Sequence, residues 1–293
     1  NKNYLKAYLN LGHIFYLKKN YSKSINLYQK ILSLDSNYTD ALNNIGIVYI
    51  DIKKYSEAIK YLSKSVNLKD ADYRSHYNLG SAYLETRNFK KSIFHFLEAT
   101  RLKPHYPIAY NSLGFAYKKI NEFDNAIKYY KKSIEQDSNY VLAKLNYGNI
   151  LDLACEHEKA ISIYEEAINL DPNILSLRWA LLNTFPIIYS DQEEIKKFND
   201  HFNKQIEEIH NFIKKNKKYN KKDILNGLLN STNFYLHYQG IDNLKLQKKY
   251  SEAIEMLIEK IYDKTSFINN NNKKNKKIKI GFISPCFVDH SIS

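Results

Sequence analysis

Residues 40–67 read DALNNIGIVYIDIKKYSEAIKYLSKSVN, and this stretch decides the fold because its pattern recurs along the chain at a fixed spacing. The glycine within it belongs to a series in which each member lies 34 residues after the one before: Gly12, Gly46, Gly80, Gly114 and Gly148. The chain contains only eight glycines, so five on one grid indicate a repeated structural unit. Three positions after each glycine comes a large apolar or aromatic residue: Phe15, Tyr49, Tyr83, Tyr117 and Leu151.

Each copy has the periodicity of two helices, which in the second copy are predicted over residues 40–52 and 55–67. A second small residue follows each glycine by twelve positions: Ser24, Ala58, Ser92, Ala126 and Ala160. Glycine inside a helix costs about 1 kcal/mol relative to alanine, so close packing of the two helices must offset that cost. The period and the small and large positions identify a tetratricopeptide repeat. We therefore predict an all-α fold, with a right-handed solenoid of five repeats over residues 1–172.

The repeat pattern ends after residue 172, and three further segments are predicted. Residues 173–268 have helical periodicity and are expected to form a helical cap and connector, in which Trp179 covers the apolar face of the last repeat. Residues 269–277 are polar and of low complexity, which is typical of a flexible linker. Residues 278–293 open with a short apolar run, which predicts one β-strand beginning a truncated α/β domain.

Composition limits the class of protein. The chain begins at Asn1 and has one methionine, Met256, so we expect a piece of a longer protein. The net charge is +13, but the lysines are scattered instead of forming a stripe, so no nucleic-acid partner is expected. No run of 18 apolar residues predicts a membrane span. Cys155 and Cys286 lack the paired spacing of a zinc site, so no metal site is expected, and a reducing, cytoplasmic location is predicted.

A row of asparagines is the first candidate site. Two residues before four of the five glycines stand Asn10, Asn44, Asn78 and Asn146, and Ser112 stands before the remaining one, Gly114. In a stacked array these side chains would project onto one concave surface. A side-chain amide both donates and accepts hydrogen bonds, so a ladder of amides could hold an extended polypeptide without reading its side chains. The alternative is a set of solvent-facing asparagines that reflects only the abundance of this residue.

The last residues of the chain resemble a known family. Lys279, Gly281, Phe282, Ser284, Phe287 and His290 match the opening of the catalytic region of the protein O-glycosyltransferases with repeat arms, the O-GlcNAc transferase and SPINDLY group. One departure is Cys286, where animal relatives carry Asp. The run Asn233–Gly240 is similar to the connector of bacterial SPINDLY-type members, and the asparagine row to the asparagine ladder of the animal enzyme's arm.

The resemblance implies a GT-B catalytic fold, transfer of a sugar to Ser or Thr of proteins, and a nucleotide-sugar donor, UDP-GlcNAc or GDP-fucose, with no required metal. It also matches His290 to an active-site histidine, which makes it the candidate catalytic residue. Because only about the last dozen residues belong to that region, the chain alone is expected to have no transferase activity and to bind no cofactor.

Two other functions are weighed against this one. A non-enzymatic adaptor that clamps an acidic C-terminus needs Lys at the fifth repeat position. That position holds Leu9, Asn43, Tyr77, Asn111 and Leu145, so this clamp is not expected. A nucleic-acid-binding solenoid would need a basic stripe. The favoured hypothesis is a substrate-protein-binding arm of a protein O-glycosyltransferase, and the alternative is an adaptor or scaffold for protein partners.

Overall fold

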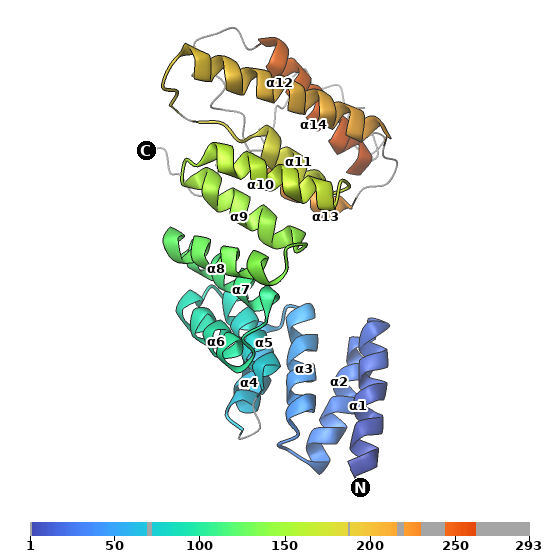
Figure 1. Cartoon of the computed structure of the whole chain (residues 1–293). Helices are drawn as coiled ribbons and strands as arrows, with labels where there is room; N and C mark the ends of the chain where they lie inside the picture. The colour runs from blue at the N-terminus through green and yellow to red at the C-terminus, as the bar shows by residue number, and fades with distance from the viewer. Residues whose placement is uncertain (1, 69–71, 187, 216–219, 230–243, 262–293) are drawn as a thin grey trace, which may run out of the picture. The chain divides into compact units, whose positions relative to one another are not determined.

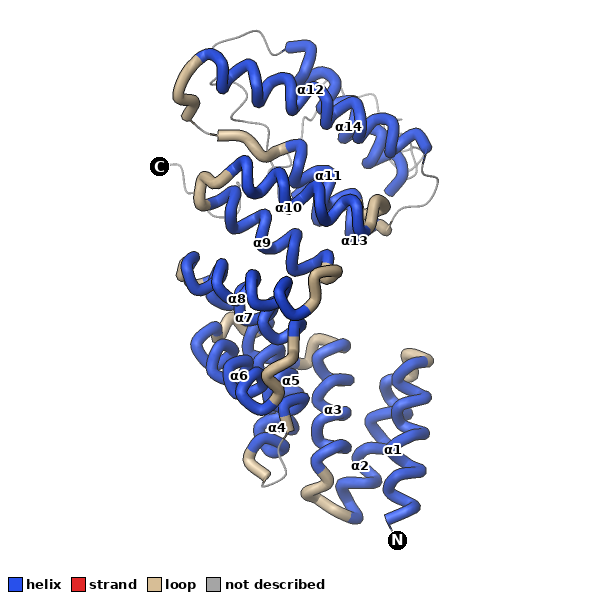
Figure 2. Tube along the Cα trace, viewed as in Figure 1, coloured by secondary structure: helices blue, strands red, loops and turns tan. Residues whose placement is uncertain are grey.

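The computed structural model describes residues 2–68, 72–186, 188–215, 220–229 and 244–261. Within these ranges every element of regular structure is an α-helix, as predicted (Figure 2). The chain forms two compact units, which divide between Ile150 and Leu151. The strand expected at the start of residues 278–293 lies outside the described residues. The boundaries predicted after residues 172, 268 and 277 stay predictions.

The first unit is a series of antiparallel helix pairs (Figure 1). Its helices follow one another in the order α1 (Lys2–Leu17), α2 (Tyr21–Leu34), α3 (Thr39–Asp51), α4 (Tyr55–Val66), α5 (Tyr73–Glu85), α6 (Phe89–Leu102), α7 (Pro107–Lys119), α8 (Phe123–Gln136) and most of α9 (Val141–Leu153). The pair predicted over residues 40–52 and 55–67 is α3 and α4. In each repeat we name the first helix A and the second helix B.

The repeated glycines are required because a large side chain of helix B lies directly against helix A. A Cβ atom added at Gly46 would stand 2.4 Å from Cγ of Leu62, where something must shift. The same contact recurs at Gly12, Gly80 and Gly114, whose added Cβ atoms would approach Tyr28, Phe96 and Tyr130 within 2.8 Å or less. The large residue always follows the glycine by sixteen positions. Glycine therefore makes room for one buried side chain per repeat.

The second small position, twelve residues after the glycine, has a further role where it holds serine. Ser24 Oγ donates to the carbonyl oxygen of Gly12 at 2.9 Å, and Ser92 Oγ donates to that of Gly80 at 2.8 Å. Where the position holds Ala58, Ala126 or Ala160, the residue is fully buried. The two helices of a repeat thus approach closely at both small positions.

The turn between the helices of each repeat has the same backbone geometry. A residue with a positive φ of 57° to 61° follows each helix A: Lys19, Lys53, Arg87, Asn121 and Cys155. At the second turn the Lys54 amide donates to the Tyr49 carbonyl at 2.8 Å, and the Lys53 amide donates to that of Ile50 at 2.9 Å. This pair of bonds is a Schellman cap, which is why the turn length does not vary between repeats.

Successive repeats are held together by apolar contacts between one helix B and the next helix A. Between α2 and α3 these contacts join Tyr28 and Ile31 to Ala41, Ile45 and Val48, all at most 1% exposed. Because these contacts join each repeat to the adjacent one, the first unit is stabilised by a sum of local interfaces.

The second unit contains α10 (His157–Leu170), α11 (Leu175–Leu182), α12 (Gln192–Lys215), α13 (Lys221–Leu229) and α14 (Leu244–Ile261). Its core combines residues of all five helices. Trp179 is 1% exposed, and its ring lies 5.3 Å from that of Tyr250 in α14. It is thus part of the core of this unit, which the prediction of a cover over the last repeat did not include. Asp223 accepts hydrogen bonds from the backbone amides of Leu175 and Ser176 and so caps α11 from α13.

Candidate functional site

The predicted asparagine row lies on the A helices, and the structure gives its members different surroundings. Asn10 on α1 is exposed, whereas Asn44 on α3, Asn78 on α5 and Asn146 on α9 are half-buried. Ser112, at the fourth place in the row, donates to the carbonyl of Ile108 in its own helix at 3.0 Å. The half-buried amides are therefore reachable from solvent while being held by neighbours.

Two of these asparagines are bonded to a second set of asparagines that sequence reasoning did not single out as a site. Nδ2 of Asn78 donates to Oδ1 of Asn43 at 2.8 Å, and Nδ2 of Asn146 donates to Oδ1 of Asn111 at 2.9 Å. Asn43 and Asn111 are 4% and 6% exposed and stand at the fifth repeat position. The signal that could have found them is an asparagine followed by another 35 residues later.

Asn44 has a different partner, because the fifth position of the preceding repeat holds Leu9. Its side chain forms a hydrogen bond with the hydroxyl of Tyr28. Burial raises the pKa of Tyr28, while this bond and one with Ser24 act in the opposite direction. Each half-buried asparagine of the row is thus fixed by a side chain of the repeat before it.

Tyrosines replace the amide bridge between the third and fourth repeats. Tyr77 stands at the fifth position, with its ring centroid 5.3 Å from that of Tyr106, and Tyr73 meets Tyr106 edge-on at 5.2 Å. Nζ of Lys103 lies over the rings of Tyr73 and Tyr106, at 4.6 and 5.0 Å from their centroids. Burial raises the pKa of Tyr106 well above its ordinary value, so its hydroxyl stays protonated.

This alternation of amides and tyrosines defines the candidate site, which we call the A-helix surface: Asn43, Asn44, Asn78, Tyr77, Tyr106, Asn111 and Asn146. An asparagine side chain has two N–H donors and one carbonyl acceptor. After one N–H of Asn78 or Asn146 is used on its neighbour, a second N–H and the carbonyl oxygen remain. Those groups can accept and donate hydrogen bonds at a peptide backbone, and the tyrosine rings can contact its side chains.

A histidine pair lies inside the third repeat. Nδ1 of His76 and Nδ1 of His95 are 3.2 Å apart, and the His95 ring stacks on that of Tyr83 at 5.6 Å. Burial lowers the pKa of both, and the neighbouring His76 helps lower the pKa of His95 to about 4. Near pH 7 one neutral ring donates to the other. In the described residues no group of three or more His, Cys, Asp or Glu could hold a metal.

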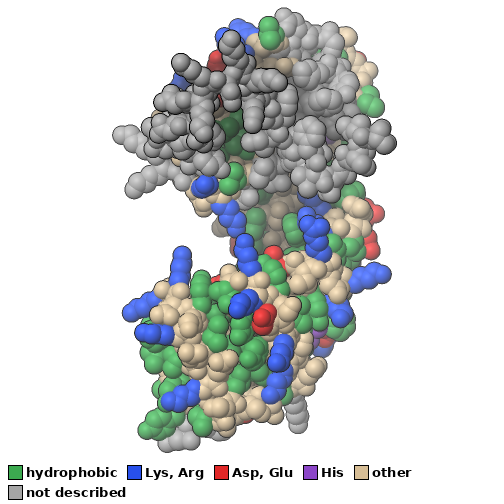
Figure 3. Space-filling view, turned by 180° about the vertical axis from the view of Figure 1, so that it is seen from behind, with side chains coloured by type: hydrophobic (Ala, Val, Ile, Leu, Met, Phe, Trp, Pro, Cys, Tyr) green, Lys and Arg blue, Asp and Glu red, His purple; other side chains and the backbone are tan. Residues whose placement is uncertain are grey.

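The remaining sequence predictions concern the tail, the membrane and the charge. His290 and the residues that would precede a nucleotide-sugar site lie outside the described residues. Among the helices that the structure describes, none is long and apolar enough to cross a bilayer. On the face drawn in Figure 3 the visible Lys and Arg side chains are spread over the surface and do not gather into one stripe.

Comparison with known families and structures identifies the repeats. Models of the tetratricopeptide repeat match residues 12–53, 39–72, 73–106, 107–140 and 143–174. The chain belongs to the tetratricopeptide repeat family. These ranges follow the period that the glycines set. No curated protein sequence matches the chain.

Among solved structures the tetratricopeptide repeat chain is similar in fold to MamA, YrrB and the pilF protein of Pseudomonas aeruginosa. A crystal structure of MamA is 27% identical, with a TM-score of 0.52 over 55% of this chain and 94% of that one. YrrB, described as a TPR protein with an unusual peptide-binding site, is 23% identical, with a TM-score of 0.50 over 59% of this chain and 89% of its own. The pilF protein of Pseudomonas aeruginosa is 16% identical, with a TM-score of 0.61 over 73% and 94%.

Proposed function

We propose that the repeats bind polypeptides, and that the A-helix surface is where an extended segment lies. The observation that carries this proposal is the alternation of half-buried amides and tyrosines on successive A helices. Asn78 and Asn146 each keep a second N–H and the carbonyl oxygen, and the bridges to Asn43 and Asn111 fix the orientation of these half-buried side chains before a ligand arrives. Fixed groups lose less conformational entropy on binding than free ones.

We further propose that this polypeptide-binding array is the arm of a protein O-glycosyltransferase in the cytoplasm. Support comes from the resemblance of Lys279–Ser291 to the opening of the catalytic region and of Asn233–Gly240 to the connector. The parent protein would transfer a sugar from UDP-GlcNAc or GDP-fucose to Ser or Thr of the bound protein, with His290 at its active site. The repeats would hold the acceptor protein, and residues 278–293 would contribute to the catalytic region.

A non-enzymatic adaptor is the second candidate. It is favoured by the solved structures, because MamA and the pilF protein are each matched over 94% of their own length by a chain of repeats. Both candidates need the same A-helix surface and differ only in the chemistry that follows. Incubating the full gene product with each nucleotide sugar and an unfolded acceptor protein distinguishes them, since only the transferase gives a glycosylated acceptor.

The binding proposal is tested by changing the asparagine row together. One amide–backbone hydrogen bond contributes only about 0.5–1.5 kcal/mol net. Replacing Asn10, Asn44, Asn78 and Asn146 by Ala should therefore weaken binding of unfolded peptides roughly ten- to a thousandfold. A matched control changes Asn26 and Asn169, which are exposed on B helices, to Ala.

The titration is run at a temperature where thermal melts show all variants folded, because Asn78 and Asn146 also join successive helices. Equal peptide affinity in the wild type and the fourfold variant would remove the proposal. Equal loss in the control variant would also remove it, because the effect would then not belong to the A-helix surface.

A further inference from the structure

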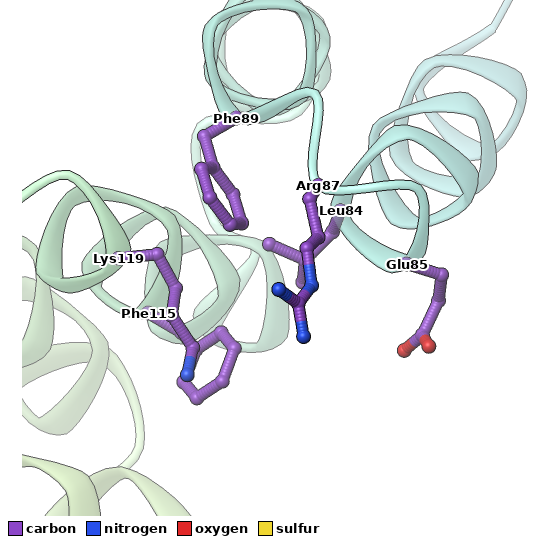
Figure 4. Close-up of a pocket in the computed structure, with 6 residues that line it drawn as sticks. All are labelled: Leu84, Glu85, Arg87, Phe89, Phe115 and Lys119. Atoms are coloured by element: carbon purple, nitrogen blue, oxygen red, sulfur yellow. The ribbon is translucent and has the colours of Figure 1, made fainter. Parts of the chain in front are cut away.

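The third and fourth repeats enclose a pocket that the binding surface described above does not use. Its volume is about 580 Å3, and it lies where the end of α5 and the start of α6 face the end of α7 (Figure 4). Three half-buried apolar side chains line it, from Leu84, Phe89 and Phe115. Three exposed charged residues complete the lining: the cations Arg87 and Lys119 and the acid Glu85.

The same positions one repeat earlier hold a different pair of side chains. The residues 34 positions before Phe89 and Lys119 are Tyr55 and Glu85. There the hydroxyl of Tyr55 donates to Oε2 of Glu85 at 3.2 Å, so the two side chains bridge the junction between repeats. At the third junction phenylalanine has no hydroxyl, and the acid is replaced by a base. The bridge cannot form, and the position is left with a cation instead of a paired carboxylate.

The first junction, like the second, places a tyrosine beside an acid, although the tyrosine stands at a different repeat position. Asp51 occupies the position of Glu85 and Lys119, and the hydroxyl of Tyr16 forms a hydrogen bond with it. Burial, the bonded Asp51 and its charge together raise the pKa of Tyr16 to about 12. In two of these three junctions, therefore, a tyrosine from the preceding repeat is hydrogen-bonded to an acid, and only the third has a base at that position.

The residues that carry the two cations have different local environments. Arg87 has a φ of 59°, and its Schellman turn is fixed by the Asn88 amide, which donates to Tyr83 O at 2.8 Å. Nζ of Lys119 lies 5.1 Å from the centroid of the Phe115 ring. Among the residues that the structure describes, neither cation has an ion pair, and the nearby Glu85 lies on the far side of Arg87 from Lys119 (Figure 4).

We infer that this pocket binds an internal segment of a polypeptide in which an apolar, preferably aromatic, side chain stands beside Asp or Glu. The apolar side chain would enter between Phe89 and Phe115, and the carboxylate would meet Arg87 and Lys119. The volume lies within the range of sites that hold one large side chain or a small ligand. The charged residues of the lining are the two cations and Glu85, whose carboxylate already accepts from the Tyr55 hydroxyl, so the excess of positive charge favours a carboxylate in the partner. This inference rests on the proposed polypeptide binding and adds its sequence preference.

The test compares three short peptides, acetylated and amidated so that their only charges are on side chains. One carries Glu-Phe-Glu between serines and glycines, the second Lys-Phe-Lys, and the third Glu-Ser-Glu. For the full chain we expect the first to bind roughly three- to thirtyfold more tightly than Lys-Phe-Lys, which is the range for two partly exposed ion pairs. It should also bind more tightly than Glu-Ser-Glu, which keeps both carboxylates but has no apolar ring to bury. Raising the salt concentration should reduce the difference.

The decisive variant introduces at this junction the tyrosine and glutamate found one repeat earlier. Phe89→Tyr combined with Lys119→Glu recreates the pair formed by Tyr55 and Glu85, so the fold should be kept while the site is lost. Binding of the Glu-Phe-Glu peptide should fall to the level of the other two, with an unchanged melting temperature. Arg87→Asn removes one cation and should weaken binding. The turn should be kept, because asparagine tolerates a positive φ. Lys53→Asn, at the same backbone position one repeat earlier with a φ of 59°, is the matched control and should bind as the wild type does.

Equal affinity for Glu-Phe-Glu and Lys-Phe-Lys, or unchanged binding by the double variant, would overturn the inference. Tighter binding of an unblocked peptide that ends in phenylalanine would also overturn it, because the carboxylate would then come from a chain end. If a generic unfolded peptide still binds in these cases, only this pocket's role fails. If no unfolded peptide binds the chain, the proposed function fails as well.

Discussion

The two units of the chain bury their apolar surface in different ways. In the first unit each repeat buries one large side chain against its own glycine and one apolar patch against the next repeat. In the second unit α11, α12 and α14 contribute to a single core around Trp179, Phe202 and Tyr250. The stability of the repeats is therefore spread over many equivalent local contacts, whereas that of the second unit depends on one core. In the repeats the core positions are needed for packing, so binding is expected to depend on the side chains at the surface.

The largest expected effect tests the single core. Trp179→Ala should destabilise the second unit by about 3–5 kcal/mol, because it removes a fully buried ring that contacts Tyr250. Denaturant unfolding followed by circular dichroism should then show a separate early transition, with the first unit unfolding later. A single transition shifted as a whole would mean that the two units do not differ in this way.

A smaller effect is expected from one repeat. Gly80→Leu places a side chain where an added Cβ is already 2.8 Å from Phe96, and overpacking of this kind typically costs about 1–3 kcal/mol. The loss should extend to the neighbouring repeats, since their interfaces are shared. The matched variant Gly227→Ala lies in the second unit, where the nearest atom is 3.4 Å away, and should cost less. An unchanged thermal melt for Gly80→Leu would show that the repeat register is wrong.

The bridging asparagines should matter by about 1 kcal/mol. Asn78→Ala leaves Oδ1 of the buried Asn43 without its partner, and loss of one such bond costs on the order of 0.5–1.5 kcal/mol. Combining it with Asn43→Ala should cost less than the sum of the two single changes. Thermal unfolding of the two single variants and the double variant measures this coupling, and strict additivity would show that the bridge contributes nothing.

The smallest effect concerns pH and the histidine pair. The pKa of His95 in the folded chain, about 4, lies below the ordinary value of 6.5, so the folded state favours the neutral ring. Its contribution to stability is present above about pH 6.5 and is lost as pH falls towards 4. Because His95 is only half-buried, this contribution should be below about 1 kcal/mol.

His95→Tyr places at this position the residue found at Tyr61 and Tyr129, each of which stacks on a tyrosine of its own helix A. Melting temperatures of the wild type and this variant should therefore diverge less at pH 7 than at pH 5, after correction for the carboxylates that titrate in both. A difference between the two that does not depend on pH would remove the histidine pair as the cause.

Sequence alone predicted the helix pairs well because each depends on local, repeated features. The 34-residue spacing of the glycines fixed the register, and α3 and α4 begin and end within one residue of the predicted ranges. The role of Trp179 could not be predicted in full, because its contact with Tyr250 joins residues 71 positions apart with no periodic signal. The link between Asp223 and α11 was missed for the same reason.

The candidate site was predicted only in part. The asparagine row was visible as a period, but its partners were not, because Asn43 and Asn111 become meaningful only when one repeat stacks on the next. The pocket between the third and fourth repeats was likewise hidden. Phe89 and Lys119, which line it, stand at the repeat positions that hold Tyr55 and Glu85 one repeat earlier, and they cannot form the hydrogen bond that joins those two residues. The roles predicted for residues 278–293 stay predictions.

We propose that the repeats bind an extended polypeptide on their A helices and that the second unit does not contact it. Hydrogen exchange of the full chain, measured by mass spectrometry with and without a saturating unfolded peptide, tests it directly. Amide exchange should become slower in α3, α5 and α7 and stay unchanged in α12 and α14. Slower exchange in α12 and α14 alone, or no change anywhere at saturation, would contradict it.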